Sequence, residues 1–467
     1  MVPPPAYSLP KRLACAITCG SLLAAAPLPA QDVYTPIEPA PLTLADASHQ
    51  PANEVALTPP AEGPPSSEVL GDGKNSVSDS KPSIEVRGDG TSISATPHRF
   101  QYGFRLTIRG VYDDNIFLRA SNRVSDYYLA IEPGITLGFG DIVGRQENYI
   151  RFDYAPSIFL FADHSDSNAV QHLFRLEGQY RFSRLTLTFS QDVQLLEGSN
   201  LTALTSTNTA GIPALNLDAG GNTHVNIYNT LANFSYDLSS KTFLSGGVQY
   251  NVWDFPDLIS SESFNGNLFF NYNYSPKLVV GLGGTGGHNW VDAPSPDQTF
   301  EQVNARFTYQ VTGKISLNAT GGVEFRQFDN SSASDHISPV FELGATYQPF
   351  DGTTLSLRGS RRTFNSAVFA AQDYTASSIV FGARQRLCQR FFLGLTAGYE
   401  NDDYFATLDG VNATRTDNYY FVQPAVDVMV TRWLTVGAYY LHRQNNSAAA
   451  NFSFRDNQVG VRASVTF

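Results

Sequence analysis

The sequence has few cysteines, the residues that form disulfides and bind metals in many exported proteins. It contains only 3 cysteines in 467 residues, and two of them fall within residues 1–30. We interpret that segment as a cleaved secretory signal peptide, because Lys11 and Arg12 precede an apolar run and small residues precede Gln31. Only Cys388 would then remain, so the mature chain could form no internal disulfide.

Long hydrophobic runs are also missing. After the signal peptide, no stretch approaches the roughly 18 apolar residues of a transmembrane helix. Methionine (2) and tryptophan (3) are scarce and mean hydropathy is −0.19, yet the chain carries 23 tyrosines and 32 phenylalanines. This composition argues against a helical membrane bundle and against several large soluble cores.

Residues 31–98 differ in composition from the rest of the chain. They hold ten prolines and ten acidic residues against three basic ones, with few aromatics. Such a segment buries too little apolar surface to offset the entropy lost on ordering. We therefore predict a disordered, acidic, proline-rich periplasmic tail, followed by one folded domain over residues 99–467.

Apolar and polar residues alternate throughout that domain. Within residues 262–277, Phe264 and Phe270 share one parity, whereas Asn265 and Asn271 share the other. A period of two predicts β-strands with one apolar and one polar face. We expect about eighteen strands (16 to 18), near residues 101–112, 126–140, 147–161, 170–182, 185–197, 224–238, 242–254, 263–275, 278–291, 299–311, 315–328, 336–348, 353–365, 374–387, 391–401, 418–430, 433–445 and 456–467.

The links between these strands alternate in length. Segments 183–184, 276–277 and 431–432 are tight turns, whereas 198–223 and 402–417 are long. A transmembrane barrel has this asymmetry, with short periplasmic turns and long outer loops. Because every backbone polar group must be paired in hydrocarbon, strands can span a membrane only as a closed barrel. The sequence therefore predicts an all-β, antiparallel, up-and-down transmembrane barrel in a bacterial outer membrane.

Charge is distributed unevenly between the two kinds of link. Basic residues such as Lys277 and Arg432 lie in short turns, and acidic residues such as Asp163 and Asp409 lie in long loops. One explanation is that charged residues solvate both rims of the barrel. The other is that the acidic residues of the outer loops contact divalent cations that bridge lipopolysaccharide molecules. Outer-membrane lipid and lipopolysaccharide are accordingly among the expected partners.

The polar parity of the strands carries many arginines and asparagines. A charge on the lipid face is unfavourable, so these side chains should point inward. We expect a lumen lined by Arg105, Arg109, Arg151, Arg175, Arg306, Arg326, Arg358, Arg362, Arg384, Arg386, Asn265, Asn267, Asn271 and Asn273. Rings of arginine favour anions in a pore. Alternatively, the arginines pair with neighbouring acids and brace the wall.

Residues typical of enzymes or metal sites do not form recognisable patterns. The 8 histidines are scattered without metal-ligand spacing. The consecutive residues Asp163, His164 and Ser165 cannot adopt the geometry of a catalytic relay. The glycine-rich stretch 281–287 lacks the lysine of a phosphate-binding loop and suggests a side-chain-poor wall, crowded by a loop inside the lumen. We predict no enzymatic activity, no cofactor, no metal and no nucleic-acid partner.

The last residues, "VGVRASVTF", alternate and end on an aromatic side chain. Val465 and Phe467 share one parity. The stretch resembles the C-terminal strand by which outer-membrane barrels are handed to their insertion machinery, which we therefore expect as a partner. The alternative is an edge strand that happens to end in phenylalanine.

Two regions resemble a known family. The stretch Tyr112–Phe117 (YDDNIF), followed by "VSD" at 124–126 and a strand containing "PG" at 133–134, resembles the opening of the beta-barrel porin 2 family of Gram-negative bacteria. The loop 163–166 (DHSD) before an arginine-rich strand is also similar to that family. The resemblance implies an outer-membrane barrel, with some relatives linked to exopolysaccharide export, and it implies no catalytic residues.

These observations suggest two functions. The first is a porin-like channel for passive diffusion of small polar solutes, with a bias towards anions. The second is an outer-membrane component of an exopolysaccharide export or biosynthesis system, gated by partners. Aromatic rows in the lumen would favour a polysaccharide, but the inward parity carries only the scattered Phe269 and Phe392, which favours the first function.

Overall fold

The computed structural model of the protein describes residues 83–85, 92–94, 100–140, 142, 148–197, 218–219, 223–331 and 333–467. The predicted signal peptide and most of the predicted tail lie outside the described residues. Within the range assigned to the tail, β1 (Ser83–Glu85) and β2 (Ser92–Ser94) form a small antiparallel sheet.

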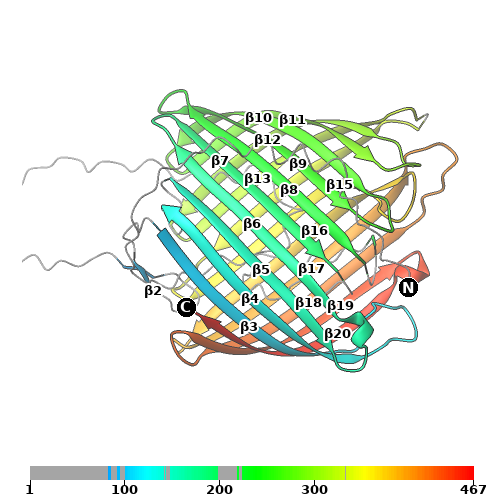
Figure 1. The fold of residues 1–467 in the computed structure, drawn as a ribbon. Helices are drawn as coiled ribbons and strands as arrows, with labels where there is room; N and C mark the ends of the chain where they lie inside the picture. Colours follow the sequence, from blue (N-terminus) through cyan, green and yellow to red (C-terminus); the bar gives the residue numbers. More distant parts are fainter. Residues whose placement is uncertain are drawn as a thin grey trace, which may run out of the picture. The chain divides into compact units, whose positions relative to one another are not determined.

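Eighteen antiparallel strands form one closed barrel (Figure 1). Each strand pairs with the next one in the chain, and β20 pairs with β3 to complete the ring. The strands are β3 (Phe100–Asp113), β4 (Asp126–Gly140), β5 (Tyr149–Phe161), β6 (Ala169–Arg181), β7 (Leu185–Leu196), β8 (Val225–Asp237), β9 (Thr242–Asp254), β10 (Ser261–Ser275), β11 (Leu278–Val291), β12 (Gln298–Thr312), β13 (Ile315–Phe328), β14 (His336–Tyr347), β15 (Thr353–Asn365), β16 (Gln372–Leu387), β17 (Phe391–Ala406), β18 (Thr416–Met429), β19 (Leu434–Ser447) and β20 (Phe454–Thr466). The predicted up-and-down barrel is confirmed.

One strand is longer than the sequence suggested. We expected the strand at 391–401 to end before the acidic pair Asp402 and Asp403, and assigned both residues to a loop. Instead β17 continues to Ala406, because Asp402 keeps the inward parity and is buried at 1% exposure, while Asp403 faces outward. The long link after β17 is correspondingly shorter.

The two faces of each strand have opposite characters, as the alternation predicts. On β10, Leu268 is 51% exposed on the outer face, whereas Asn271 is fully buried on the inner face. Exposed aromatic and aliphatic side chains cover the outside of every wall segment. This band faces lipid in a membrane barrel. Among the described residues, no helix is long and apolar enough to cross a membrane.

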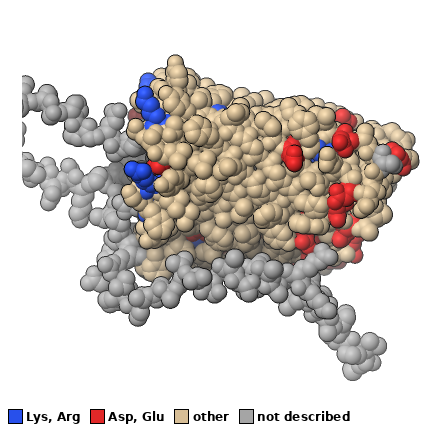
Figure 2. Space-filling model, turned by 90° about the horizontal axis from the view of Figure 1, so that it is seen from above, with Lys and Arg blue, Asp and Glu red and all other residues tan. Residues whose placement is uncertain are grey.

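The short and long links lie at opposite ends of the barrel. The turns 182–184, 276–277, 313–314 and 388–390 are at the end where the chain terminates (Figure 1). Figure 2 shows Lys and Arg gathered at this end and Asp and Glu gathered at the other, where the long loops lie. The charge asymmetry of the links is therefore a property of the folded barrel.

Prolines within strands interrupt the hydrogen-bond ladder. The β4–β5 pairing skips the positions around Pro133 and Pro156, and the β18–β19 pairing skips those around Pro424. Proline has no N–H to donate, which explains both gaps. In each case pairing resumes beyond the gap. Beside Pro339 in β14 the pairing with β15 does not resume.

Candidate functional site

The inner wall of the barrel carries the arginines that the sequence analysis assigned to it. At least five of the ten form ion pairs with acidic side chains of the same wall, within the described residues. The pairs are Arg109–Glu132 (2.5 Å), Arg151–Asp153 (2.7 Å), Arg175–Glu177 (3.3 Å), Arg326–Glu324 (2.9 Å) and Arg362–Glu342 (2.5 Å). These arginines brace the wall, which was the alternative to an anion-attracting ring.

Arg306 is held differently. Its Nε donates to Asn271 Oδ1 at 2.7 Å and its Nη2 donates to the hydroxyl of Ser245. Its guanidinium lies over the ring of Phe269, 4.4 Å from the centroid. No acid pairs with it within the described residues, so Arg306 contributes a net positive charge to the inner wall.

The glycines of β11 make room for this arrangement. A Cβ on Gly283 would lie 2.5 Å from Cγ of Phe269, and a Cβ on Gly281 would lie 2.4 Å from Oδ1 of Asn271. The side-chain-poor wall expected from 281–287 is present. Side chains of the neighbouring strands, rather than a loop, occupy the space over these two glycines.

The remaining predicted arginines are spread over the height of the lumen. Arg358 is exposed on the inner face of β15, and Arg384 lies over the ring of Phe392 at 4.9 Å. Arg105 and Arg386 are partly buried near the end with short turns. Register places Arg361, opposite Phe341, on the other face from Arg358 and Arg362, so these three neighbouring arginines of β15 do not form one surface.

The four predicted asparagines share the inner face of β10. Asn265, Asn267 and Asn271 are buried, and Asn273 is partly exposed. Asn271 donates to Phe243 O, Phe269 O and Ser245 Oγ, and thereby ties β9 to β10. Asn265 faces a cavity, as described below. These carboxamides make the wall polar without adding charge.

The outer mouth is narrowed by the hairpin of β15 and β16. The link 366–371 crosses to the far wall, where Ile259 N donates to Ala367 O at 2.8 Å and Ala367 packs with Val225, Ile227 and Phe255. Those residues belong to β8, seven places from β15 around the ring, and to the link between β9 and β10, five to six places away. The hairpin tip therefore lies across the mouth.

Asp218 and Arg415 hold this crossing in place. Asp218, from the link after β7, is 2% exposed and accepts from Ser366 Oγ (2.9 Å), Ala367 N (2.5 Å) and Tyr404 Oη (2.9 Å). Arg415 Nη1 lies 3.5 Å from Asp218 Oδ1. Burial raises the pKa of the Asp218 carboxyl above its usual range, while the Arg415 guanidinium opposes that shift.

Arg415 also joins other outer links. It pairs with Asp417 at 2.6 Å, and its guanidinium lies 3.8 Å from the ring centroid of Phe452 and 4.6 Å from that of Tyr404. Phe452 belongs to the link between β19 and β20. Arg415 therefore connects loops from several strand pairs into one structure, which we call the mouth cluster (Asp218, Ser366, Tyr404, Arg415 and Phe452).

Below the mouth lies a cavity of about 230 Å³ on the inner side of β9 to β15. Uncharged polar side chains dominate its lining, and the charged ones include two acids that pair with arginines. The lining includes the carboxamides Gln249, Asn251, Asn265, Asn289, Gln302, Asn304 and Asn365, the aromatics Trp253, Phe269, Phe300, Phe341 and Phe364, and the charged Glu324, Arg326, Glu342, Arg361 and Arg362. The cavity can offer many hydrogen bonds and several rings to a polar solute.

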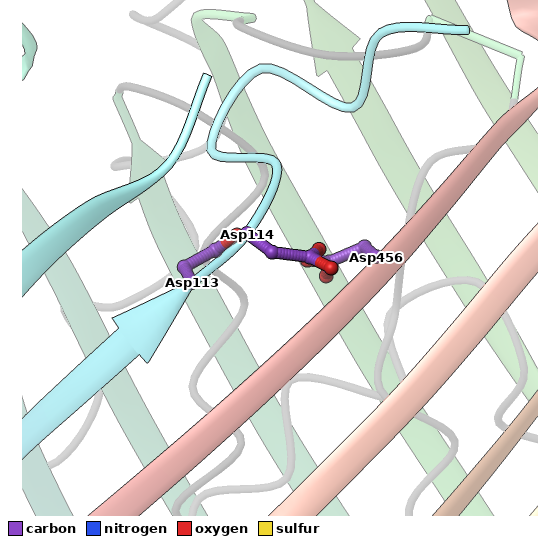
Figure 3. Close-up of side chains that lie close together, drawn as sticks. All are labelled: Asp113, Asp114 and Asp456. Atoms are coloured by element: carbon purple, nitrogen blue, oxygen red, sulfur yellow. The ribbon is translucent and has the colours of Figure 1, made fainter. Parts of the chain in front are cut away.

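Three carboxylates meet where β3 and β20 close the barrel. Oxygens of Asp113, Asp114 and Asp456 lie within 4.8 Å of one another (Figure 3). Nitrogen donors surround them: Asn115 N and Gln458 Nε2 on Asp113, Asn457 N and Nδ2 on Asp114, and Arg443 Nε on Asp456. We interpret the cluster as a hydrogen-bonded connection between the first and last strands, and we assign no metal to it.

The C-terminal residue takes part in that closure. Phe467 N donates to Phe104 O (2.9 Å) and Phe104 N donates to Phe467 O (3.1 Å). The Phe467 ring is stacked near Trp433, with 6.4 Å between centroids. Val465 pairs with Leu106 of β3 and with Leu434 of β19. The role of Val465 and Phe467 as an insertion signal remains a prediction.

Sequence reasoning did not find the mouth cluster. Asp218 lies in a long link without periodicity, and Arg415 lies in the predicted loop between the strands at 391–401 and 418–430. It also did not assign Trp253, Phe300 or Phe364 to the lumen lining, although the parity of Phe300 with Gln302 and Arg306 would have indicated it. Contacts between links depend on the curvature of the closed barrel, which a pattern along one strand does not contain.

Comparison with known proteins agrees with this architecture. Residues 303–467 match the family described as "Putative beta-barrel porin 2". The resemblance inferred from the sequence is thus confirmed, although the match lies in β12–β20, outside the stretch Tyr112–Phe117. No curated protein sequence matches the chain.

Solved structures of outer-membrane proteins align with most of the chain. A loop-deletion mutant of OmpT from Vibrio cholerae aligns with TM-score 0.36 and 10% identity, over 79% of this chain and 100% of that one. OpdK of Pseudomonas aeruginosa with vanillate aligns with TM-score 0.39 and 11% identity, over 78% of this chain and 99% of that one. OccK2 of the same organism aligns with TM-score 0.42 and 11% identity, over 78% of this chain and 98% of that one. The chain is thus a closed β-barrel whose last nine strands, β12–β20, are similar to the family described as a putative beta-barrel porin.

Proposed function

We propose that the protein is an outer-membrane channel for passive diffusion of small polar solutes, and that the cavity below the mouth cluster is its narrow part. The lining of that cavity by carboxamides within a closed barrel carries the proposal. Such a lining can replace the hydrogen bonds that a solute loses when it leaves bulk water. The exposed apolar outer wall supports the membrane location.

We propose only a modest preference for anions. Paired arginines cancel most of the charge that they bring, because each has a carboxylate within ion-pair distance. Arg306 has no such partner within the described residues, and Arg358 is exposed on the inner face. These two side chains are the proposed source of the anion bias.

Solute flux into liposomes tests the proposal. Purified mature protein, reconstituted into vesicles, should allow swelling in isosmotic solutions of neutral monosaccharides, with rates that fall as solute size increases. Protein-free vesicles and vesicles holding heat-unfolded protein are the controls. Swelling no faster than in the protein-free vesicles, from protein whose gel mobility shows that it is folded, would contradict passive diffusion.

One observation favours the second candidate, a component of exopolysaccharide export gated by partners. Trp253, Phe300 and Phe364 add aromatic rings to the polar lining, and sugar rings stack on aromatic faces. This candidate predicts little flux from the isolated protein and higher flux once export components are added. Binding of an oligosaccharide that changes Trp253 fluorescence, in protein that does not conduct, would support it over the open channel.

The route to the membrane belongs to the same proposal. Cleavage of residues 1–30 would export the chain, and Val465 with Phe467 would present the last strand to the barrel-insertion machinery. Outer-membrane lipid and lipopolysaccharide would then surround the apolar wall. The acidic loop end and the basic turn end seen in Figure 2 fit an orientation with the long loops outside the cell.

A further inference from the structure

The barrel wall is split between β14 and β15. Their pairing runs from Tyr347–Leu355 up to Phe341–Arg361 and stops there. Beyond that point, residues 336–340 of β14 stay paired with β13, and residues 362–365 of β15 stay paired with β16. Every other neighbouring pair of strands in the ring has a longer ladder. The two strands therefore separate towards the outer mouth.

The sequence explains why the ladder ends there. Pro339 removes a backbone donor from β14, and proline is usual at strand edges. The hairpin of β15 and β16 then bends into the lumen, as the crossing link 366–371 requires. Thr363 and Thr375 lie on the outward-facing side of β15 and β16, the side of Arg361 and Ser377. Both threonines are nevertheless buried, because this part of the hairpin bends inward from the barrel wall.

The split is bounded above and below. Below it is the Phe341–Arg361 pair. Above it, the ring of His336 on β14 stacks on Phe405 of β17, with 3.9 Å between centroids and 5° between planes. The contact joins β14 to a strand three places further round the ring and bridges the top of the gap. We call the enclosed gap the wall opening (bounded by His336, Val340, Phe341, Arg361 and Phe405).

The cavity of the lumen reaches this opening. Its lining includes Val340 and Glu342, which face inward, together with Phe341 between them, which faces outward and is 37% exposed. On each of the strands β9 to β13 the lining residues share the inward parity, whereas β14 and β15 contribute consecutive residues of both parities. Residues of both parities on β14 line it because the wall is open at this edge.

The chemistry of the outer face at the opening is amphipathic. Below the opening, Phe341 and Leu343 are exposed apolar side chains. At its level, Arg361 is paired across the sheet with Ser377, which is paired in turn with Asn401, so the outward row is polar. A change from apolar to polar is expected at the upper edge of the hydrocarbon band, at the depth of lipid headgroups, although Ile337 above it on β14 is an apolar side chain with 61% exposure.

Arg361 lacks a counter-charge at this position. Its Nη1 donates to Ser377 Oγ at 2.5 Å, and its Nε is buried without a hydrogen-bond partner. No ion pair of Arg361 occurs among the residues that the structure describes. A guanidinium so placed is suited to an anionic group that accepts from several of its N–H donors at once.

We propose that the wall opening admits the headgroup of an anionic amphiphile of the membrane into the cavity, with Arg361 binding the acidic group and the acyl chains remaining against Phe341 and Leu343. The inference goes beyond the diffusion of polar solutes, since the ligand would enter from the membrane and not from the outer mouth. The site would give the lumen a second, lateral entrance.

Native mass spectrometry of the folded mature protein tests this proposal, with dimyristoylphosphatidylglycerol as the probe and dimyristoylphosphatidylcholine as the uncharged-headgroup comparison. We expect one phosphatidylglycerol to be retained at activation energies that remove other lipid. R361Q should weaken this retention about tenfold, the loss of one charge-assisted contact. R361K should retain part of the preference, and R455Q, at an exposed outward-facing arginine of β20, should leave it unchanged.

Other outcomes would overturn the proposal. Equal retention by wild type, R361Q and R455Q would show that Arg361 does not bind the headgroup. Equal retention of the two lipids would show that charge does not select the ligand. Displacement by glycerol 1-phosphate at the same concentration as lipid would indicate a site for free anions that needs no lateral entrance. Heat-modifiable gel mobility checks that each variant is folded.

Discussion

Asp218 and Arg415 lie on loops from opposite sides of the barrel, and their Oδ1 and Nη1 atoms are 3.5 Å apart. The pair is buried, and it holds the tip of the β15–β16 hairpin across the outer mouth. A contact across the full width of a barrel limits what can pass through it. The width of the channel is therefore set by the outer loops as well as by the number of strands.

Removing Arg415 should widen the mouth. R415Q leaves the buried Asp218 carboxylate without its counter-charge, which costs roughly 3–5 kcal/mol for a broken buried pair. The loops would separate at that cost while the strand ladder stays intact. We expect a larger single-channel conductance from R415Q. R119Q is the control, because Arg119 is an exposed outer-loop arginine whose guanidinium lies over the ring of Phe117, outside the mouth cluster. Equal conductance of the two variants would contradict the prediction.

The mouth should respond to pH through Asp218. Burial raises the pKa of this carboxyl, so the closed mouth binds its proton more tightly than an open one in which the ordinary pKa of about 3.9 returns. Protonation of Asp218 therefore stabilises the closed mouth fully at a pH below the carboxyl's ordinary pKa. This stabilisation is lost as the pH rises through the raised pKa that Asp218 has in the closed mouth. Conductance should therefore increase with rising pH across that interval. D218N should remove the step and D166N, at an exposed loop acid, should keep it.

Glycine at position 283 should be required for the Phe269 contact. G283A places a Cβ 2.5 Å from Cγ of Phe269 and 2.3 Å from Leu268 O, an overpacking that costs about 1–3 kcal/mol. G286A on the same strand meets nothing within 4 Å and should change stability by less than about 0.5 kcal/mol. Urea unfolding followed by gel mobility compares the two. Equal stability of the G283A and G286A barrels would contradict the prediction, because it would mean that the Phe269 ring and strand β10 move aside at no cost.

Ion selectivity should depend on unpaired arginines and not on paired ones. R306Q removes a charge that no acid balances, so the reversal potential in a salt gradient should move towards cations. The double variant R362Q/E342Q removes both members of a 2.5 Å ion pair and should leave the reversal potential nearly unchanged. A larger shift from the double variant than from R306Q would reverse our assignment of the anion bias.

Alternation along single strands was enough to predict the barrel. Phe264 and Asn265 already show which face of β10 meets lipid, and the same rule places both ends of most strands within two residues. The rule failed at Asp402, where two consecutive acids were read as a loop although Asp402 fits the inward parity of a longer β17. We placed the end of the strand at the two consecutive acids, although the alternation of inward and outward residues continues through them.

The site was much harder to predict. Whether Arg362 attracts anions or pairs with Glu342 depends on cross-strand register, and the sequence left both alternatives open. The contact of Asp218 with Ser366 joins residues 148 positions apart in links that have no period. No ladder defect was predicted at Pro339, although a proline within a strand lacks a backbone donor, and only the structure reveals that pairing does not resume beyond it.

Single-channel recording of the refolded mature chain in a planar bilayer, with a salt gradient across it, tests the central claim most directly. The account predicts open steps, with a reversal potential displaced slightly towards anions and a larger step for R415Q. No conductance from folded wild type and from folded R415Q would contradict the passive channel and would favour the export component that opens only with its partners.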